Sequence, residues 1–303
     1  MAEHALHIGL IGDASGYHLR DLARAGRDGG HQVSIIPWTA LGSAIQGEHE
    51  QLHPLACGHC DALIIRGMPR GGLEEVVFRM NAVARLEAAG TTVINPPRSL
   101  EIAIDKYLTT ARLVDARLPV PRTAVAQEAD AIRAQWTALG GDVVLKPLFG
   151  SCGRGLERLA SAAELETFLD RRRPDSPAYL QEFLPHPEGD IRVLLVGKRA
   201  FAIRRRSQDW RTNVSLGAIA EPLEPTAEML ELARRAAAAV GSVLAGVDLL
   251  PTADGRLVVL EVNAVPGWKG VSATCGVDIA AEVIALTEAA VSRSSRPSPA
   301  QNP

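Results

Sequence analysis

The sequence predicts a protein of the α/β and α+β class, in which a domain built on a parallel sheet precedes a larger mixed region. Over residues 1–97, short apolar runs alternate with helical patterns, which is typical of a parallel sheet covered by helices on both faces. Farther along, strand patterns separated by tight turns indicate antiparallel hairpins. The chain has 303 residues, of which 47% are apolar, so it is long enough for about two or three structural units.

In the first domain, residues 7–12 form a short apolar run that ends in glycine, and this run predicts a buried strand. The expected strands are 7–12, 32–36, 61–66 and 91–95, and the expected helices are 17–27 and 73–89. Gly9, Gly12 and Gly16 resemble a dinucleotide-binding loop only weakly, because their spacing is wrong and no acidic residue closes the second strand. We therefore reject NAD binding.

Beyond Pro97, helices and strand-rich segments continue to residue 291. The expected helices are 100–116, 162–171, 226–245 and 278–291, and the expected strands are 120–125, 143–147, 178–183, 191–196, 200–204, 247–250 and 256–262. We divide the chain into an N-terminal domain (1–97), two further subdomains (98–183 and 184–291) and a Ser- and Pro-rich tail (292–303), which we expect to be disordered.

Composition argues against several classes of function. Lys and Arg number 32 against 35 Asp and Glu, a formal net charge of −3, whereas a dedicated nucleic-acid binder normally has a basic excess. No apolar segment approaches the length of a transmembrane helix, and the first residues lack the features of a signal peptide. We therefore expect a cytoplasmic protein without nucleic-acid or membrane partners. Cys57 and Cys60 have the spacing of a metal-binding or redox pair, but no second pair completes a metal site, so we interpret them as loop thiols.

The most informative segment is the predicted hairpin around Asp254-Gly255, a strong signal for a two-residue β-turn. That register places Asp248 directly opposite Glu261, and Asn263, two residues farther on, points to the same face. Two carboxylates that face each other in apolar surroundings repel unless a cation lies between them. Carboxylate and amide oxygens suit Mg²⁺. The alternatives are that nearby arginines satisfy the carboxylates, or that the register shifts.

A lysine followed by a glycine-rich loop is a candidate phosphate cradle. Lys146 precedes loop 147–155, in which glycines let backbone N–H groups approach an anion while the lysine adds a positive charge. The chain has no P-loop motif, and an ordinary turn is the alternative interpretation. Other cationic features are Lys106, which opens a helix, and a cluster of arginines at 204–206 and 211, for which an exposed strand edge is the alternative.

Together these motifs resemble the ATP-grasp superfamily and, within it, the RimK-type glutamate ligases. The segments that occur in the family's order and spacing are Lys106, Lys146 with its loop, 181–184, 190–192, 211–213, Asp248 and 261–267. The resemblance implies an ATP-grasp fold, in which 98–183 and 184–291 grip ATP, preceded by a Rossmann-like domain. It also implies that ATP phosphorylates a carboxylate and that an amine then attacks the acyl phosphate, which gives an amide, ADP and phosphate.

The resemblance also implies roles for individual residues. Those implied to bind the nucleotide are Lys106, Lys146, Gly150, Ser151, Gly153, Gly155, Glu182, Phe183, Asp190, Arg211, Thr212 and Asn213. Lys146 and Arg211 would assist catalysis, and the glycine loop would be a mobile flap. Those implied to hold two Mg²⁺ ions, for which Mn²⁺ can substitute, are Asp248, Glu261 and Asn263, in agreement with the hairpin argument.

Two arginines are expected to contact substrate, Arg66 and Arg192. Arg66 ends the predicted strand 61–66, and ligands of open α/β sheets gather at the carboxyl ends of strands. Its planar guanidinium suits the carboxylate of an acceptor. The alternative is a surface arginine paired with Glu74 or Glu75.

The identity of the acceptor depends on finer sequence features. Members that modify a ribosomal protein tail differ from this chain over residues 211–218, whereas 66–74 and 78–81 are more similar to the branch that adds α-linked glutamate to tetrahydromethanopterin. The expected substrates are therefore L-glutamate and a small carboxylate acceptor such as that cofactor. A protein or peptide C-terminus is the alternative acceptor, and a nucleotide-binding module without catalysis is the alternative class. A homo-oligomer, either dimer or tetramer, is a further expectation.

Overall fold

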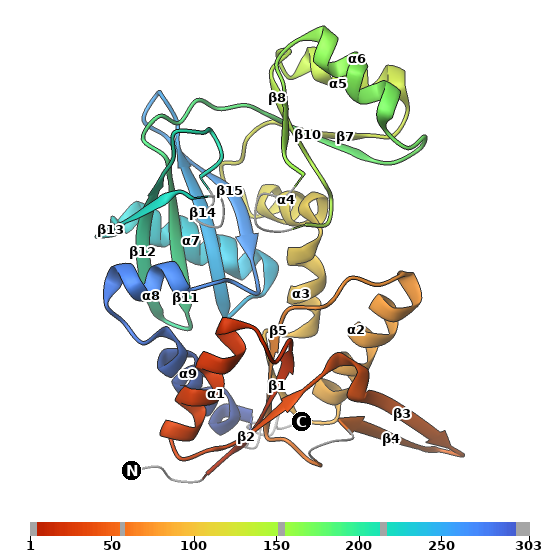
Figure 1. The fold of residues 1–303 in the computed structure, drawn as a ribbon, viewed down its shortest axis with the longest axis vertical. Helices are drawn as coiled ribbons and strands as arrows, with labels where there is room; N and C mark the ends of the chain where they lie inside the picture. The colour runs from red at the N-terminus through yellow and green to blue at the C-terminus, as the bar shows by residue number, and fades with distance from the viewer. Residues whose placement is uncertain (1–4, 55–57, 151–154, 213–216, 295–303) are drawn as a thin grey trace, which may run out of the picture.

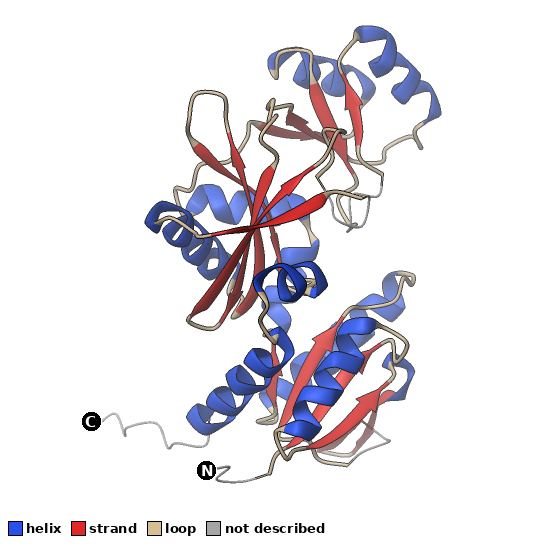
Figure 2. Ribbon diagram, turned by 60° about the vertical axis from the view of Figure 1, so that its left-hand side comes forward, coloured by secondary structure: helices blue, strands red, loops and turns tan. Residues whose placement is uncertain are grey.

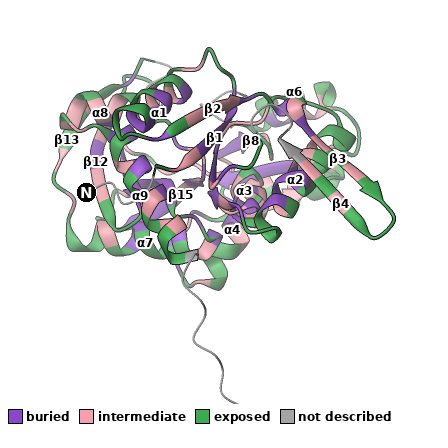
Figure 3. Ribbon diagram, turned by 90° about the horizontal axis from the view of Figure 1, so that it is seen from below, coloured by how far each residue is buried: buried purple, intermediate pink, exposed green. Residues whose placement is uncertain are grey.

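The computed structural model describes residues 5–54, 58–150, 155–212 and 217–294, which form three bodies arranged along one axis (Figure 1). An N-terminal domain lies at one end, a five-stranded sheet lies in the middle, and a smaller four-stranded domain lies at the other end. Buried residues concentrate in the sheets, and the outer helical faces are exposed (Figure 3). The first sheet is parallel and the later ones are antiparallel, so the predicted fold class is confirmed.

The N-terminal domain has four parallel strands in the order β2-β1-β5-β6. Its main elements are β1 (His7–Gly12), α1 (Tyr17–Asp28), β2 (Gln32–Ile36), β5 (Ala62–Arg66), α2 (Leu73–Ala88) and β6 (Thr92–Ile94). Alternate side chains of each strand point to opposite faces, so Ile8 and Leu10 pack under α1 while Ile11 and Ile65 pack under α2. The last helix, α9 (Ile279–Ser294), returns to this domain and packs beside α1.

Residues 37–60 contain structure that the sequence did not predict. After a short 3₁₀ helix (η1, Trp38–Ala40), strands β3 (Leu41–Gln46) and β4 (His49–Pro54) form a hairpin that projects from the domain (Figure 1). Cys60 is buried, and Cys57 lies outside the described residues. Helix α9 extends three residues beyond the predicted end at 291, and the rest of the predicted tail, 295–303, also lies outside the described residues.

The central sheet is antiparallel, with the order β13-β12-β11-β14-β15. Its elements are β11 (Asp190–Val196), β12 (Arg199–Arg206), β13 (Ile219–Leu223), β14 (Leu244–Pro251), β15 (Leu257–Asn263), α3 (Pro97–Ile104), α4 (Lys106–Asp115), α7 (Ala227–Val240) and α8 (Lys269–Cys275). Helices α3, α4 and α7 lie near β15, whereas α8 packs against β12 and β13 (Figure 2). The single helix predicted over 100–116 is two helices, because Asp105 ends the first and caps the second by accepting from the Leu108 N–H.

The hairpin of β14 and β15 places Asp248 opposite Glu261, as predicted, but the register between the turn and this pair differs from the predicted one. Next to the turn, Pro251 pairs with Leu257 and the Thr252 N–H donates to the Arg256 carbonyl, so the loop, 253–255, has three residues and the predicted two-residue loop is wrong. Gly255 adopts a φ of +82°, the left-handed conformation that such a loop needs. A bulge beside Asp248 then shifts the register by one residue and restores the predicted pair.

The small domain is a four-stranded antiparallel sheet with two helices on one face (Figure 2). Its elements are β7 (Thr123–Ala126), α5 (Ala129–Ala138), β8 (Val143–Lys146), β9 (Glu157–Leu159), α6 (Ala162–Arg171) and β10 (Ala178–Glu182). Its core joins Ile132 and Leu165 of the helices to Leu145 and Leu180 of the sheet. Across the part of the chain that the structure describes, no single helix has both the length and the apolar composition of a membrane span; α8 and α9 meet that test only together, across a bend of 110°.

The side chain of Asn95 connects the N-terminal domain to the central sheet. Its Nδ2 donates to the Leu244 and Ala264 carbonyls, each at 2.6 Å, and its Oδ1 accepts from the N–H groups of Val243 and Leu244. The side chain is only 1% exposed, so water cannot replace these partners. One amide therefore satisfies backbone groups at the start of β14 and directly after the end of β15, the strand on which Glu261 lies.

Replacing Asn95 by Ala should destabilise the protein by about 3 kcal/mol, because several buried backbone groups lose a partner. Differential scanning calorimetry would measure the change. The control is Ser99→Ala, which removes one buried hydroxyl pair with Ser242 and should cost about 1 kcal/mol. Equal shifts in the melting temperature of the two variants would contradict this account.

Candidate active site

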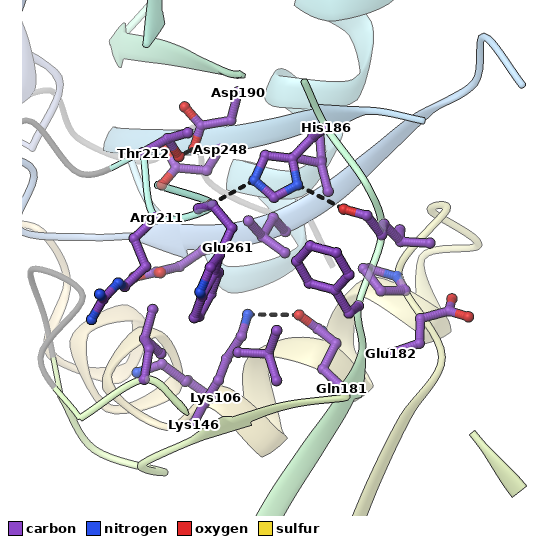
Figure 4. A pocket seen from close by; sticks show the side chains of 18 of the residues that line it. Lys106, Lys146, Gln181, Glu182, His186, Asp190, Arg211, Thr212, Asp248 and Glu261 are labelled. Atoms are coloured by element: carbon purple, nitrogen blue, oxygen red, sulfur yellow. Dashed lines mark hydrogen bonds between the residues drawn. The ribbon is translucent and has the colours of Figure 1, made fainter. Parts of the chain in front are cut away.

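A pocket lies between the small domain and the central sheet, and both bodies contribute to its lining (Figure 4). The predicted site residues that line it are Lys106, Lys146, Gly150, Glu182, Phe183, Asp190, Arg211, Thr212, Asp248 and Glu261. The predicted residues Ser151, Gly153 and Asn213 lie outside the described residues. Arg66, Arg192, Gly155 and Asn263 are not part of the lining.

The two predicted phosphate lysines enter the pocket from different elements. Lys146 is the last residue of β8, and its Nζ donates to the Gln181 Oε1 atom of the neighbouring strand at 2.6 Å (Figure 4). Burial lowers the pKa of Lys146 to about 8, although the nearby charge of Glu261 acts in the opposite direction. Lys106 is the first residue of α4, and its Nζ donates to the Gly150 carbonyl at 2.9 Å. Both ammonium groups are therefore available to an anion beside the start of the glycine loop.

Aromatic side chains surround the opposite end of the pocket. Phe183 lies within 6.1 Å of the Trp210 ring and 5.9 Å of the His186 ring, measured between centroids. The guanidinium of Arg158 stacks on Phe183 at 3.6 Å. The carboxylate of Glu182 points away from the pocket and accepts from the backbone and side chain of Arg122 (Figure 4). A flat apolar ring such as a nucleobase suits this end.

His186 fixes the loop that carries Trp210. Its two ring nitrogens lie 2.6 Å from the Leu184 carbonyl and 2.7 Å from the Trp210 carbonyl. The imidazole therefore joins the segment that follows β10 to the segment that follows β12 (Figure 4).

Two buried aspartates and two arginines form a network in the central sheet. Arg192 donates to both oxygens of Asp248, at 2.6 and 2.7 Å, and Arg205 lies 2.9 Å from one of them. Arg205 also holds Asp190, which accepts in addition from the Thr212 hydroxyl. Burial would raise the pKa of Asp248, but the two arginines outweigh it and lower that pKa to about 2. Burial dominates for Asp190 and raises its pKa.

The two facing carboxylates differ in their surroundings, which corrects the expectation that they simply repel. The arginines neutralise Asp248, as in the alternative raised from the sequence. Glu261 forms no ion pair within the described ranges, and it faces Lys146 across the pocket. Those ranges also contain no cluster of three or more His, Cys, Asp or Glu side chains that could hold a metal ion. The carboxylate oxygens present here fit a Mg²⁺ ion that is also bound by phosphate oxygens and takes only one or two carboxylates from the protein.

Asn263 and Arg211 lie at the margins of the site. Asn263 is two residues beyond Glu261 on the same face of β15, and its Oδ1 accepts from the Val265 N–H at 2.8 Å. Arg211 reaches the pocket rim, where its guanidinium is paired with Asp209 at 2.7 Å. Arg211 must leave this exposed partner before it can contact a nucleotide.

The two predicted substrate arginines occupy different environments. Arg192 is bound to Asp248 inside the sheet. Arg66 is half-buried, donates to the Pro266 carbonyl at 2.8 Å and lies 4.3 Å above the Trp268 ring. It therefore contacts the loop that follows β15 rather than Glu74 or Glu75, and the alternative of a paired surface arginine is wrong.

Sequence reasoning gave no individual role to four polar or aromatic residues of the pocket, namely Gln181, His186, Arg205 and Trp210. Gln181 was noted only within segment 181–184, and its role could have been found, because a polar residue inside the otherwise buried strand β10 requires a partner. Arg205 was noted only as part of a basic cluster. His186 and Trp210 lie in loops, and no local pattern brings loops together.

Comparisons with known proteins agree with this geometry. Residues 103–287 match the RimK-like ATP-grasp domain. The chain is 33% identical to the tetrahydromethanopterin:alpha-L-glutamate ligase of Methanosarcina acetivorans over 259 residues, which cover 74% of this chain and 78% of that protein. It is 31% identical to the probable alpha-L-glutamate ligase of Xanthomonas axonopodis pv. citri over 293 residues, which cover 92% and 95%.

Solved structures show the same fold. The ATP-grasp ligase PsnB complexed with a minimal precursor matches with a TM-score of 0.73 at 24% identity, covering 95% of this chain and 99% of that chain. A PsnB complex that also contains Mg and ADP gives a TM-score of 0.72, with 95% and 98% covered. A RimK domain protein from Sphaerobacter thermophilus gives 0.72 at 24% identity, with 92% and 98% covered. The predicted ATP-grasp fold is confirmed.

Replacing Arg205 by Met should destabilise the protein by about 3 to 5 kcal/mol, because Asp190 loses its arginine and Asp248 loses one of two inside the sheet. The matched control is Arg206→Met, since the neighbouring residue on the same strand forms only exposed ion pairs, which are worth at most about 1 kcal/mol. Chemical denaturation followed by circular dichroism would compare them. If both variants unfold alike, the buried network is not a source of stability.

Proposed function

The chain belongs to the RimK-like ATP-grasp family, and on that premise we propose that it joins L-glutamate to a carboxylate acceptor at the expense of ATP. It is an ATP-grasp ligase, an enzyme that forms carbon–nitrogen bonds. The observation that carries the proposal is the convergence of Lys106, Lys146 and Glu261 on one pocket whose far end is aromatic. Such a pocket offers cations to a polyphosphate, a carboxylate to its metal ion and a flat surface to its base.

The proposed reaction has two steps. The acceptor carboxylate attacks the γ-phosphorus of ATP, the bond from that phosphorus to the bridging oxygen breaks, and an acyl phosphate and ADP form. The amine of glutamate then adds to the acyl carbonyl, loses a proton and expels phosphate, which leaves an amide. Neither step needs a covalent nucleophile from the protein, so the side chains act by positioning and by charge stabilisation.

Each group in the pocket has a task in this scheme. Lys106 and Lys146 stabilise the negative charge that develops on the transferred phosphoryl group, and Arg211 assists once it has left Asp209. Glu261, with Asp248 and Asn263 beside it, would hold two Mg²⁺ ions. Bound Mg²⁺ would neutralise phosphate charge and orient the γ-phosphoryl group. Phe183 and Trp210 enclose the base, and Asp190 contacts the nucleotide.

The acceptor that we propose is a small carboxylate molecule such as tetrahydromethanopterin. Relatives named for that substrate are 33% and 37% identical to this chain. The second candidate is a peptide, because structural neighbours have been solved with precursor peptides. A third possibility is that the pocket binds nucleotide without turning it over.

One assay separates these possibilities. The full chain is incubated with ATP, Mg²⁺, L-glutamate and a panel of acceptors, and mass spectrometry follows acceptor mass in steps of one glutamyl unit. An increase in the mass of tetrahydromethanopterin supports the small-molecule acceptor, and an increase only in the mass of peptides supports the peptide acceptor. If neither glutamylation nor glutamate-dependent release of ADP occurs with any acceptor, the ligase proposal fails.

Replacing Glu261 by Ala should abolish turnover, because the one unpaired carboxylate of the metal end is lost. The fold should survive, since no ion pair is broken. Melting in EDTA should therefore give the wild-type temperature or a higher one, while stabilisation by ATP with Mg²⁺ should disappear. Glu221→Ala, at an exposed carboxylate of the same sheet, serves as the control. A large loss of stability in EDTA would show that Glu261 is structural.

The affinity for ATP should fall as the pH rises through about 8. Burial has lowered the pKa of Lys146 to about 8 in the free protein, so the ammonium is mostly lost above that pH, and phosphate binding must restore it. ATP binding at pH 8.5 should therefore take up a fraction of one proton, and affinity should fall by up to about tenfold per pH unit above 8. Calorimetry in buffers of different ionisation enthalpy measures this uptake. In Lys146→Arg the uptake should vanish, and its persistence would assign it to another group.

A further inference from the structure

Three basic side chains gather where the N-terminal domain meets the loop that follows β15, outside the nucleotide pocket. We call His18, Arg66 and Lys269 the seam cluster. They come from the start of α1, the end of β5 and the start of α8, respectively, and all three lie around Trp268 or its neighbours (Figure 1). None of them takes part in the chemistry described above.

Trp268 is the centre of the seam cluster and is fully buried. Its backbone N–H donates to His18 Nε2 at 3.0 Å, and its indole N–H donates to Asp21 at 3.0 Å. The imidazole of His18 lies edge-on to the indole at 4.7 Å, and the Arg66 guanidinium lies 4.3 Å from the ring centroid. The indole thus fixes the positions of His18 and Arg66 relative to each other.

Arg66 carries a charge that no carboxylate neutralises. Its Nη2 donates to the Pro266 carbonyl, but Nε and Nη1 are shielded from water and have no hydrogen-bond partner among the described residues. Burial lowers its pKa to about 9, and no opposing acid offsets this shift. Asp21, which contacts the same indole, is engaged by Trp268 and Arg24.

The surroundings of Arg66 are therefore electropositive and incomplete. His18 accepts from Trp268 and is neutral at pH 7, because burial and the charge of Arg66 lower its pKa to about 4. Lys269 adds an exposed ammonium 5.5 Å from the Tyr17 ring. Helix α1 begins here with neither an acidic residue in its first turn nor a side-chain cap. A desolvated guanidinium with spare donors is costly unless an anion binds to it.

The seam cluster lies close to the site of chemistry. Pro266, which Arg66 contacts, follows the metal-end residues 261–263 in the chain. Gly246 pairs with Asn263, and a Cβ at Gly246 would lie only 3.0 Å from Pro266 and 3.3 Å from Arg192. A molecule whose reacting end is at Glu261 could therefore extend along this loop to Arg66.

We propose that the seam cluster binds a substrate carboxylate that takes no part in the reaction. This inference rests on the proposed function, in which L-glutamate reacts through its amine and keeps both of its carboxylates. An acceptor with a second carboxylate would supply the same chemistry. Arginine with unused donors, together with a nearby lysine, matches the charge of a carboxylate, and binding supplies the missing partners of Arg66. The seam cluster should therefore bind a substrate that carries this carboxylate more tightly than the neutral amide of the same substrate.

The test measures binding without turnover. The full chain with Mg²⁺ and a non-hydrolysable ATP analogue is titrated with L-glutamate, with L-glutamine and with tetrahydromethanopterin as the acceptor probe. Arg66→Met should weaken one of the two carboxylate ligands at least about tenfold, the loss expected for one charge-assisted contact, and Lys269→Met should weaken the same ligand less. Binding of the ATP analogue should not change. Lys198→Met, at an exposed turn of β11 and β12, is the control.

Each outcome has a definite meaning. If Arg66→Met binds L-glutamate more weakly than the wild type does, the site belongs to the incoming amino acid. If it binds tetrahydromethanopterin more weakly, the site belongs to the acceptor. Unchanged affinities, equal losses that include the ATP analogue, or no saturable binding of either probe to the wild type would overturn the proposal.

The site and the ligase proposal fail separately. If Arg66→Met ligates glutamate with unchanged KM values, the seam cluster is not a substrate site but the proposed function stands. If the wild type binds L-glutamate through Arg66 yet forms no product with any acceptor, the carboxylate site stands and the ligase proposal falls.

Discussion

The central sheet depends on the mutual neutralisation of four charges, those of the buried Asp190, Arg205 and Asp248 and of the half-buried Arg192. The four residues belong to three adjacent strands, so their pairing fixes how β11, β12 and β14 align. Because Asp248 is held in place, the residue opposite it on β15 has a fixed position as well. That residue is Glu261, the carboxylate that faces the nucleotide pocket. The position of Glu261 thus follows from an ion-pair network, three members of which, Asp190, Arg205 and Asp248, also line the pocket.

Local sequence patterns predicted most of the architecture, and they failed where structure depends on distant partners. The alternation of apolar runs and helices gave the parallel sheet of the first domain, since its two central strands, β1 and β5, are buried on both faces. The hairpin 41–54 was missed because its strands are mostly exposed and lack a clear alternation. Nothing in the helix ending at Ser294 shows that it packs beside α1, because its apolar face could cover either neighbouring sheet.

In the site, too, local features could be predicted and contacts between distant segments could not. Lys146, its glycine loop and the pair of Asp248 with Glu261 could be predicted, because a strand end and a hairpin are local features. The pair was right although the loop was wrong, since a bulge cancelled the error of one residue. The arginine partners of Asp248 could not be predicted, because cross-strand pairing with β11 and β12 brings them together. The sequence raised neutralisation by arginine as an alternative but did not identify the residues.

The charges of the site fall into two groups, and this division indicates where ligands bind. Arg192 and Arg205 are each matched by aspartates in a buried network, so they offer no net attraction to a further anion. Within the part of the chain that the structure describes, Lys106 and Lys146 at the pocket and Arg66 at the seam cluster form no ion pair with a carboxylate; all three have a carbonyl or amide oxygen as their hydrogen-bond acceptor. A neutral oxygen completes a hydrogen bond of such a side chain but does not neutralise its positive charge. A polyphosphate in the pocket and a carboxylate at the seam cluster would each neutralise a positive charge that the protein leaves without a counter-charge. This is the physical condition under which a site binds anionic substrates more tightly than their neutral analogues.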